Sequence, residues 1–345
     1  MDLLTHYFQI VLLGIVEGVT EFLPISSTGH LLIAEHLLGT NEPDVFNVVI
    51  QAGAILAVLF IYWHQIMDLI SNLDRPEARD YLFKLAGAFV ITGIIGYVLT
   101  HTLHLKLPET LAPVAWATLI GGLVIFTIEL FAKNLYQHED VSWPEAILIG
   151  LAQIVAGIFP GTSRSGATIM TGLAMGMKRP AATEFSFLVG IPTMFAASGL
   201  EMVKYRKELT SGSHQLLIDI ALGFVISAVV AFFVVKWLLR FVQSHTFNGF
   251  AIYRVLLGGG LLIAIALHPS LSAIGKEEPI KAIIAPAQME PTSAAVPPTN
   301  VVVPSPETPA HEPPRALPVT PADTTNTDSS MAPPAVSTNV PASQN

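Results

Sequence analysis

The sequence predicts an all-α polytopic membrane protein with six transmembrane helices and two opposed re-entrant helix-turn-helix hairpins in an inverted repeat. Three observations lead to this prediction. Of the 345 residues, 52% are hydrophobic and 12% are charged, and the mean hydropathy is +0.58, whereas soluble proteins carry roughly 25% charged residues. Apolar segments of membrane-spanning length recur along the chain. Two further apolar regions are each interrupted by a polar cluster.

Six apolar segments are long enough to cross the hydrocarbon core of a bilayer, which takes about 20 residues. They lie near Val45–Tyr62, Phe83–Thr100, Ala112–Phe131, Phe185–Val203, Leu216–Leu238 and Phe250–Leu267. Two further regions, Phe8–Leu38 and Glu145–Met177, are divided by FLPISSTGH and FPGTSRSGAT. Non-helical backbone is tolerated at membrane depth only where protein or water covers it. Each of these two regions is therefore expected to form two half-helices around a polar turn.

The two interrupted regions also resemble each other in sequence. GIVEGVTEFLPISSTGH aligns with GLAQIVAGIFPGTSRSGA, with Gly14 on Gly150, Pro24 on Pro160 and one extra residue in the second turn. Because three spanning segments separate the hairpins, the second is expected to enter from the opposite face, so that the turns meet near the midplane. We place the repeat halves at about 1–105 and 106–268, within a membrane domain of residues 1–268.

The rest of the chain adds few functional signals. From position 269 to 345 it holds sixteen of the 25 prolines, and such a segment is expected to be a disordered extension. The N-terminus lacks the basic region of a signal peptide and is expected to be retained. Lysines and arginines near the span ends divide eight to six, which places both termini outside the cytoplasm. The net charge of −9 argues against nucleic-acid binding, and the absence of cysteine excludes thiolate chemistry.

Two carboxylates mark the first hairpin. Glu17 and Glu21 are four residues apart, so they project from one face of a helix. An ionisable group at the bilayer centre costs at least ~2.5 kcal/mol, and like charges repel. The pair is therefore expected to hold a divalent cation, Mg²⁺ or Ca²⁺, or to share a proton. The alternatives are that one carboxyl is neutral or that both lie in a hydrated vestibule.

Hydroxyl groups and a histidine follow the break at Pro24. Ser26, Ser27 and Thr28 stand at the start of the next half-helix, where hydroxyls and backbone N–H groups bind anions. Helix capping alone would also explain them. His30 can donate or accept a proton near neutral pH.

The second turn supplies positive charge. Arg164 lies between Ser163 and Ser165 and, with Thr168, is expected to bind a phosphate group, which a guanidinium can hold by two parallel hydrogen bonds. A snorkelling arginine at the membrane surface is the alternative. Together the two turns carry the groups that phosphoryl chemistry requires, without the loop GxxxxGK[ST] of nucleotide enzymes. We expect Arg254 to snorkel. Glu184 is expected either at the rim of the site or as a carboxylate at the start of an interfacial helix.

These segments resemble a known family. EGVTEFLPISSTGHL and PGTSRSGATI, with AATEFSFLVGIP and FAIYR, are similar to the signature segments of the bacterial integral-membrane undecaprenyl-diphosphate phosphatases, the BacA-type bacitracin-resistance proteins. The similarity covers about Leu3 to Leu267. It implies hydrolysis of undecaprenyl diphosphate to undecaprenyl phosphate and inorganic phosphate, which recycles the lipid carrier for peptidoglycan synthesis. It also implies the bacterial inner membrane, with an active site that opens to the periplasm.

The resemblance also implies roles for individual residues. Glu17 and Glu21 match the family's ExxxE pair, which carries catalysis and a divalent metal ion. Ser27 matches the serine proposed as nucleophile or phosphate contact, and His30 and Arg164 match the family's histidine and arginine. Whether Ser27 or an activated water attacks stays open. A homodimer is compatible with the sequence, which does not determine the oligomeric state.

Two other functions share features with this sequence. Inverted repeats with broken helices would also suit a polyprenyl-phosphate flippase or an anion carrier, but such a carrier has no evident use for two adjacent carboxylates. The other lipid-phosphatase superfamily requires a histidine after its SR pair, and Met170 stands at that position.

Overall fold

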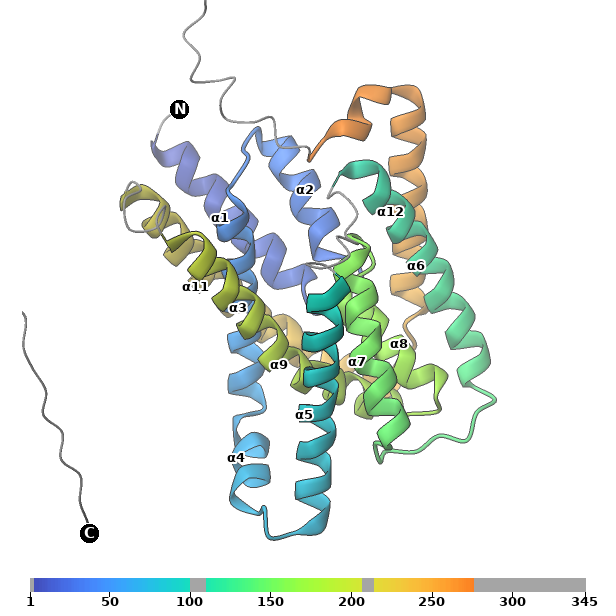
Figure 1. The fold of residues 1–345 in the computed structure, drawn as a ribbon. Helices are drawn as coiled ribbons and strands as arrows, with labels where there is room; N and C mark the ends of the chain where they lie inside the picture. Colours follow the sequence, from blue (N-terminus) through green and yellow to red (C-terminus); the bar gives the residue numbers. More distant parts are fainter. Residues whose placement is uncertain (1–2, 100–109, 207–213, 276–345) are drawn as a thin grey trace, which may run out of the picture. The chain divides into compact units, whose positions relative to one another are not determined.

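The computed structural model describes residues 3–99, 110–206 and 214–275, which are almost entirely helical and belong to one compact unit, Met1–Ala285 (Figure 1). The helices are α1 (Leu3–Thr20), α2 (Ser27–Leu38), α3 (Asp44–Ile61), α4 (Trp63–Ser71), α5 (Pro76–Tyr97), α6 (Leu111–Ala132), α7 (Trp143–Ile158), α8 (Arg164–Ala174), α9 (Arg179–Lys204), α11 (His214–Ser244) and α12 (Asn248–Leu267). No β-strand occurs in these ranges, which hold only an isolated bridge between His138 and Met177. The predicted all-α polytopic membrane fold is confirmed.

Seven of the described helices are long and apolar enough to cross a membrane, by length and composition. Six of them, α3, α5, α6, α9, α11 and α12, occupy the six predicted spans. The seventh is α1, which we expected to be the first arm of a hairpin and which has 18 residues. Its counterpart α7 has 16 residues. The predicted end of the second span, Thr100, lies outside the described residues.

The first hairpin consists of α1, a turn over residues 21–26, and α2. Pro24 lies in the middle of this turn, and its missing backbone N–H prevents a continuous helix. At the other end of the hairpin, Gln9 Nε2 donates a hydrogen bond to the Leu38 carbonyl oxygen at 2.8 Å. The start of α1 and the end of α2 therefore lie together, as a helix-turn-helix hairpin requires.

The second hairpin has the same form, with α7 and α8 joined by a turn over residues 159–163 that contains Pro160. The segment before α7 is hydrogen-bonded to the segment after α8. Lys178 N donates to the His138 carbonyl oxygen at 2.8 Å, and His138 N donates to the Gly176 carbonyl oxygen at 3.1 Å. The chain that enters α7 thus lies beside the chain that leaves α8.

The two hairpins point toward each other. In Figure 1 the arms of the first hairpin extend upward from its turn, whereas α7 and α8 extend downward from theirs. The turns touch, because Ser165 Oγ donates to the Leu23 carbonyl oxygen at 3.1 Å. The predicted opposition of the hairpins is therefore present in the structure.

The packing of the helices is similar in α1–α6 and in α7–α12. Helix α1 packs on α11 as α7 packs on α5, while α3 packs on α9 and α6 on α12. The aligned glycines make these crossings close. A Cβ atom on Gly14 would lie 3.0 Å from the Gly223 carbonyl oxygen, and one on Gly150 would lie 2.8 Å from that of Ala88. Each of these two aligned glycines thus lies against a backbone carbonyl of a neighbouring helix. This shared contact supports the repeat that the sequence alignment predicted.

The start of the expected extension differs from the prediction. Pro269–Ala273 form a 3₁₀ helix, and Leu111 N at the start of α6 donates to the Ile274 carbonyl oxygen at 3.0 Å. The first residues of the extension are held because an unpaired N–H at a helix start takes a partner from them. The rest of the extension, residues 276–345, lies outside the described residues.

Candidate active site

The two hairpin turns are built alike. Ser26 and Ser163 have φ angles of 78° and 70°, and they are the only non-glycine residues with positive φ in the described parts of the chain. Each caps the half-helix that follows, Ser26 Oγ accepting from Gly29 N at 3.2 Å and Ser163 Oγ from Gly166 N at 3.1 Å. Backbone conformations of this kind are strained and cluster at functional sites. The repeat alignment places these two serines at equivalent positions.

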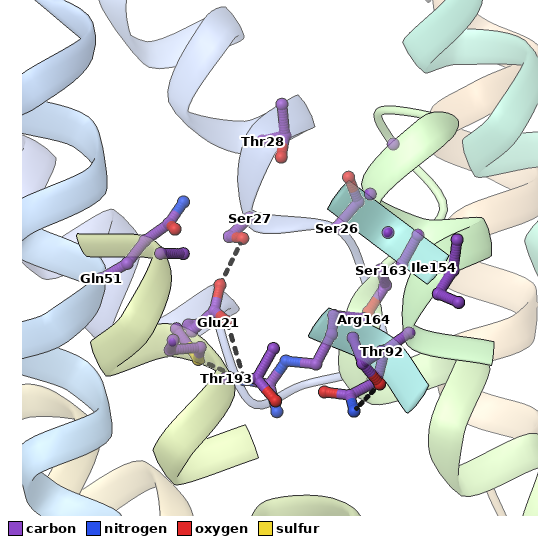
Figure 2. A pocket seen from close by; sticks show the side chains of 17 residues that line it. Glu21, Ser26, Ser27, Thr28, Gln51, Thr92, Ile154, Ser163, Arg164 and Thr193 are labelled. Carbon is purple, nitrogen blue, oxygen red and sulfur yellow. Dashed lines mark hydrogen bonds and ion pairs between the residues drawn. The ribbon is translucent and has the colours of Figure 1, made fainter. Parts of the chain in front are cut away.

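A cavity of about 330 Å³ lies between the turns and the neighbouring helices (Figure 2). Its lining includes the N-terminal ends of α2 and α8. The first turn of a helix presents unpaired backbone N–H groups and a partial positive charge, which together favour anions. The lining residues that the sequence predicted are Glu21, Ser26, Ser27, Thr28, Ser163 and Arg164.

Glu21 connects the two hairpins. Ser27 Oγ donates to Glu21 Oε2 at 2.6 Å, and Arg164 Nη2 donates to Glu21 Oε1 at 2.9 Å (Figure 2). The Nε and Nη1 atoms of Arg164 are buried and have no hydrogen-bond partner within the described chain. The guanidinium therefore keeps donors for a further oxyanion. This contact with Glu21 also excludes the alternative in which Arg164 snorkels to the surface.

Glycine at position 190 gives this guanidinium its space. A Cβ atom on Gly190 would overlap Arg164 Nη1. Phe22 lies on another side, with its ring centroid 5.8 Å from Cζ of Arg164. The guanidinium is thus held between α9 and the first turn in a defined orientation.

Glu17 is completely buried, with 0% exposure. It adjoins Glu21, as the spacing of four residues predicted, but the described cavity lining includes only Glu21. Both carboxylate oxygens of Glu17 are without a hydrogen-bond partner among the described residues. Because buried carboxylates need compensation, these orphaned oxygens fit a bound cation or proton.

His30 faces a different group from the other predicted residues. Its Nδ1 lies 2.6 Å from the Ser26 carbonyl oxygen, and its Nε2 lies 2.6 Å from the Tyr253 hydroxyl. The His30 and Tyr253 rings stack with centroids 5.7 Å apart. The histidine therefore connects the strained turn at Ser26 to α12, outside the described lining of the cavity.

The remaining predicted hydroxyls divide into two groups. Ser26, Thr28 and Ser163 line the cavity. Ser165 and Thr168 are fully buried and donate to backbone carbonyls, Ser165 to Leu23 and Thr168 to Arg164 at 3.0 Å. The structure therefore places Ser165 where it holds the two turns together, whereas the hydrogen bond of Thr168 stays within α8.

Sequence reasoning missed the other wall of the cavity. Gln153 Nε2 donates to Thr92 Oγ1 at 2.9 Å, and Thr92 Oγ1 donates to the Gly150 carbonyl oxygen at 2.8 Å. Gln153 is 4% exposed, and its Oε1 is unpartnered within the described chain. The alignment offered a signal, because Gln153 is the counterpart of Glu17 in the repeat. Gln51 and Thr193 also line the cavity.

Two expectations about single residues differ from the structure. Arg254 does not snorkel, because its side chain is completely buried and donates to backbone carbonyls of both hairpin turns. The expectation was wrong because the turns offer a partner that the local sequence does not reveal. Glu184 accepts a hydrogen bond from Gln65 at 2.6 Å, and the described residues that line the cavity do not include it.

The arrangement suits an anionic substrate and its hydrolysis. One guanidinium with free donors and two helix N-termini face the cavity, which favours a phosphate group. Beside them a serine hydroxyl donates to a carboxylate, which is the geometry of a nucleophile and its base.

Comparison with known proteins points in the same direction. A family model described as Bacitracin resistance protein BacA matches residues 10–260. A protein of Rhizobium leguminosarum bv. trifolii is 52% identical over 257 residues, which cover 74% of this chain and 96% of the relative. A protein of Rhizobium etli is 53% identical with the same coverage. One of Xylella fastidiosa is 51% identical over 259 residues, 74% of this chain and 97% of its own length. All three carry the name undecaprenyl-diphosphatase.

Proposed function

The chain belongs to the BacA family of bacitracin resistance proteins, and we propose that the site between its two hairpin turns hydrolyses undecaprenyl diphosphate. The reaction gives undecaprenyl phosphate and inorganic phosphate, and so recycles the lipid carrier for peptidoglycan synthesis. The observation that supports the site is the position of Glu21 between Ser27 and Arg164. Glu21, as the base, thus lies in contact with the Ser27 hydroxyl of its own hairpin and with the phosphate-binding Arg164 of the other hairpin.

The terminal phosphate binds at Arg164. An N–H group of the guanidinium that has no partner within the described chain, at Nε or Nη1, donates to a phosphate oxygen, and the N–H groups at the starts of α2 and α8 face the same group. These donors are held by the fold before substrate arrives. Such preorganised donors stabilise the charge that develops on a transferring phosphoryl group.

Ser27 acts as the nucleophile. Its Oγ attacks the terminal phosphorus, and its proton passes to Glu21 Oε2, which already accepts its hydrogen bond at 2.6 Å. The bond between the terminal phosphorus and the bridging oxygen breaks, and undecaprenyl phosphate leaves with the electron pair. Glu21 passes this proton on to the departing undecaprenyl phosphate and is a carboxylate again. A water molecule then attacks the phosphoserine and gives its proton to Glu21, which returns it to Ser27 Oγ as the bond between phosphorus and Oγ breaks and inorganic phosphate is released.

His30 supports this chemistry by holding the first turn in place. Its two ring nitrogens lie beside the Ser26 carbonyl and the Tyr253 hydroxyl, so the ring holds the turn that presents Ser27. A role in proton transfer, as the family resemblance implies, stays a prediction.

A divalent cation fits beside Glu17. The orphaned oxygens of this carboxylate are hard ligands of the kind that Mg²⁺ and Ca²⁺ prefer. No group of three or more histidine, cysteine or acidic side chains suited to a metal occurs among the described residues. Phosphate oxygens and water would therefore complete the coordination, as is usual for Mg²⁺. Such an ion supplies neutralisation of phosphate charge.

The site opens toward the periplasm of the inner membrane in this proposal. The cavity adjoins a second hollow that shares Gln51 and Ala197 with it and extends to Leu200 and Lys204. This hollow lies toward the C-terminal end of α9, on the side that the charge count placed outside. Leu37 tests the orientation, because it is 77% exposed at the end of α2 and should lie on the outer side of the membrane. A Leu37→Cys variant in intact spheroplasts should react with a membrane-impermeant maleimide, and protection from it until lysis would reverse the assignment.

Phosphate release from undecaprenyl diphosphate tests the activity. The purified protein should release inorganic phosphate, a chelator should stop the release, and added Mg²⁺ or Ca²⁺ should restore it. Glu21→Gln should lower the rate by at least about 100-fold, because an amide cannot take the proton of Ser27. Glu139→Gln at the mouth of the second hairpin is the matched control, since Glu139 pairs with Lys178 outside the cavity, and it should keep the wild-type rate.

The possible contrary outcomes separate the parts of the proposal. Full activity after chelation would show that the reaction needs no metal ion. Wild-type activity in folded Glu21→Gln would show that Glu21 is not the base. A folded protein that binds the lipid without releasing phosphate would favour a carrier over the hydrolase.

A further inference from the structure

A residue outside both hairpins also makes polar contacts with the two hairpin turns. Arg254 lies on α12 and is completely buried. It lies outside the described lining of the cavity. Its position raises the question of why an arginine is buried there at all, because burying an unpaired charge costs several kcal/mol.

The hydrogen bonds of the guanidinium give the answer. Nη1 donates to the Pro24 carbonyl oxygen at 3.1 Å and to that of Thr162 at 3.0 Å. Nη2 donates to the Gly161 carbonyl oxygen at 3.0 Å. One guanidinium thus holds the first turn and the second turn at once.

Two further contacts fix the guanidinium itself. Nη2 donates to the Ala117 carbonyl oxygen at 3.0 Å, and Nε donates to that of Thr118 at 3.1 Å. Both carbonyls belong to α6, which packs along α12. All five N–H groups of Arg254 therefore have a backbone carbonyl partner, three in the turns and two in α6.

The location of these carbonyls explains the choice of a cation. Pro24 follows the C-terminal end of α1, and Gly161 and Thr162 follow that of α7. Carbonyls of a non-helical turn have no partner within a helix, and inside a membrane they need one from the protein. Arg254 supplies a partner for carbonyls of both turns, whereas Arg164 begins the half-helix that follows the second turn.

We propose that Arg254 is a positioning residue that fixes the two hairpin turns relative to each other. It thereby sets the distance from Ser27 and Glu21 in the first hairpin to Arg164 in the second. The consequence for catalysis rests on the proposed function, whereas the geometric part does not. Because catalytic geometry must be held closely, a shift of about 1 Å between nucleophile and phosphate-binding group lowers the rate by about 100-fold.

A glycine in α6 provides a test that leaves Arg254 in place. A Cβ atom on Gly121 would overlap Arg254 Nη2 and lie 2.7 Å from its Cζ. The guanidinium has no freedom to move away without breaking its hydrogen bonds. Gly121→Ala should therefore displace it, although the same change in an open helix position favours the helix. Gly259→Ala on α12 is the matched control, because a Cβ atom there meets no atom of the described chain within 4 Å.

The experiment measures the relative position of the hairpins and the kinetics in the same variants. The chain has no cysteine, so spin labels can be attached at two introduced cysteines. His36→Cys on α2 and Phe159→Cys at the end of α7 replace exposed residues. Double electron–electron resonance then reports the distance between the hairpins in detergent or nanodiscs, without any turnover.

We expect one narrow distance distribution in the labelled background and in Gly259→Ala, and a broader or shifted one in Gly121→Ala and Arg254→Lys. In the two altered proteins kcat should fall by about 100-fold, while KM should change by less than about threefold, since Arg164 still binds the phosphate. Arg254→Lys keeps the charge but loses the planar set of five donors.

Two results would overturn the proposal. One is a distribution that stays narrow and unshifted in folded Gly121→Ala and Arg254→Lys, whatever their activity. The other is a broadened distribution with wild-type kcat. If Arg254→Lys does not fold, Gly121→Ala decides alone. A wild-type protein without phosphatase activity would contradict the proposed function, and the distance measurement would still decide whether Arg254 fixes the two turns relative to each other.

Discussion

Arg164→Lys is expected to lower kcat/KM for phosphate release by about 100-fold to 1,000-fold, although the charge is kept. One nitrogen of the guanidinium contacts Glu21, and the other two have no hydrogen-bond partner among the residues that the structure describes. An ammonium group is a point charge and cannot donate to Glu21 while it keeps a further N–H donor in a fixed direction for a phosphate. The loss of such preorganised donors costs this much in other enzymes. Steady-state kinetics with undecaprenyl diphosphate measures the effect.

The matched control for this change is Arg179→Lys. Arg179 also pairs with a buried carboxylate, donating from Nη2 to Glu129 Oε2 at 2.5 Å and from Nε to Glu129 Oε1 at 3.0 Å. This pair lies outside the cavity lining. We expect Arg179→Lys to lower thermal stability and leave kcat/KM near the wild-type value. Equal kinetic effects of the two changes would show that Arg164 acts through stability alone.

Ser27→Ala is expected to reduce kcat by at least about 1,000-fold, because it removes the proposed nucleophile. Thr28→Ala is the comparison. Thr28 also lines the cavity with a hydroxyl, but Ser27 is the one that donates to Glu21 at 2.6 Å. The threonine change should cost less than about tenfold, the loss of one phosphate hydrogen bond.

The route of attack can be observed directly. Substrate labelled with ³²P in the terminal phosphate should leave label on acid-quenched wild-type protein and none on Ser27→Ala. Rapid release with no labelled protein, and a Ser27→Ala variant that keeps more than a tenth of the wild-type rate, would favour a water molecule activated by Glu21 as the nucleophile.

Much of the site could be predicted because the membrane makes polar residues informative. Glu21, Ser27 and Arg164 each stand in an apolar region where a charge or a break in the helix is costly. Their segments align as a repeat, and opposed repeats bring broken helices together. The contacts of Glu21 with Ser27 and Arg164 are therefore consistent with a pattern that was visible in the chain.

The residues that were missed or misread lack such a local signal. Arg254 stands in FAIYRVLLGG, a segment in which a snorkelling arginine is equally reasonable, and its partners are 92 to 230 residues away in the chain. Thr92 and Gln153 are ordinary polar residues within helices, and only the packing of α5 on α7 turns them toward one cavity. Likewise, hydroxyls predicted to bind phosphate, such as Ser165, donate to a neighbouring turn.

The sequence by itself determined the membrane class, the helical spans, the two broken helices and the residues that carry charge into them. Apolar length and the cost of buried polar groups act locally, so they can be recognised in a single chain. Only the tertiary structure decided which of those residues meet. It placed Arg164 and Ser27 on the two oxygens of one carboxylate, turned His30 toward Tyr253, and buried Arg254 between the turns. These outcomes depend on distances and directions between distant segments, because hydrogen bonds form only over about 3 Å and within a narrow range of angles.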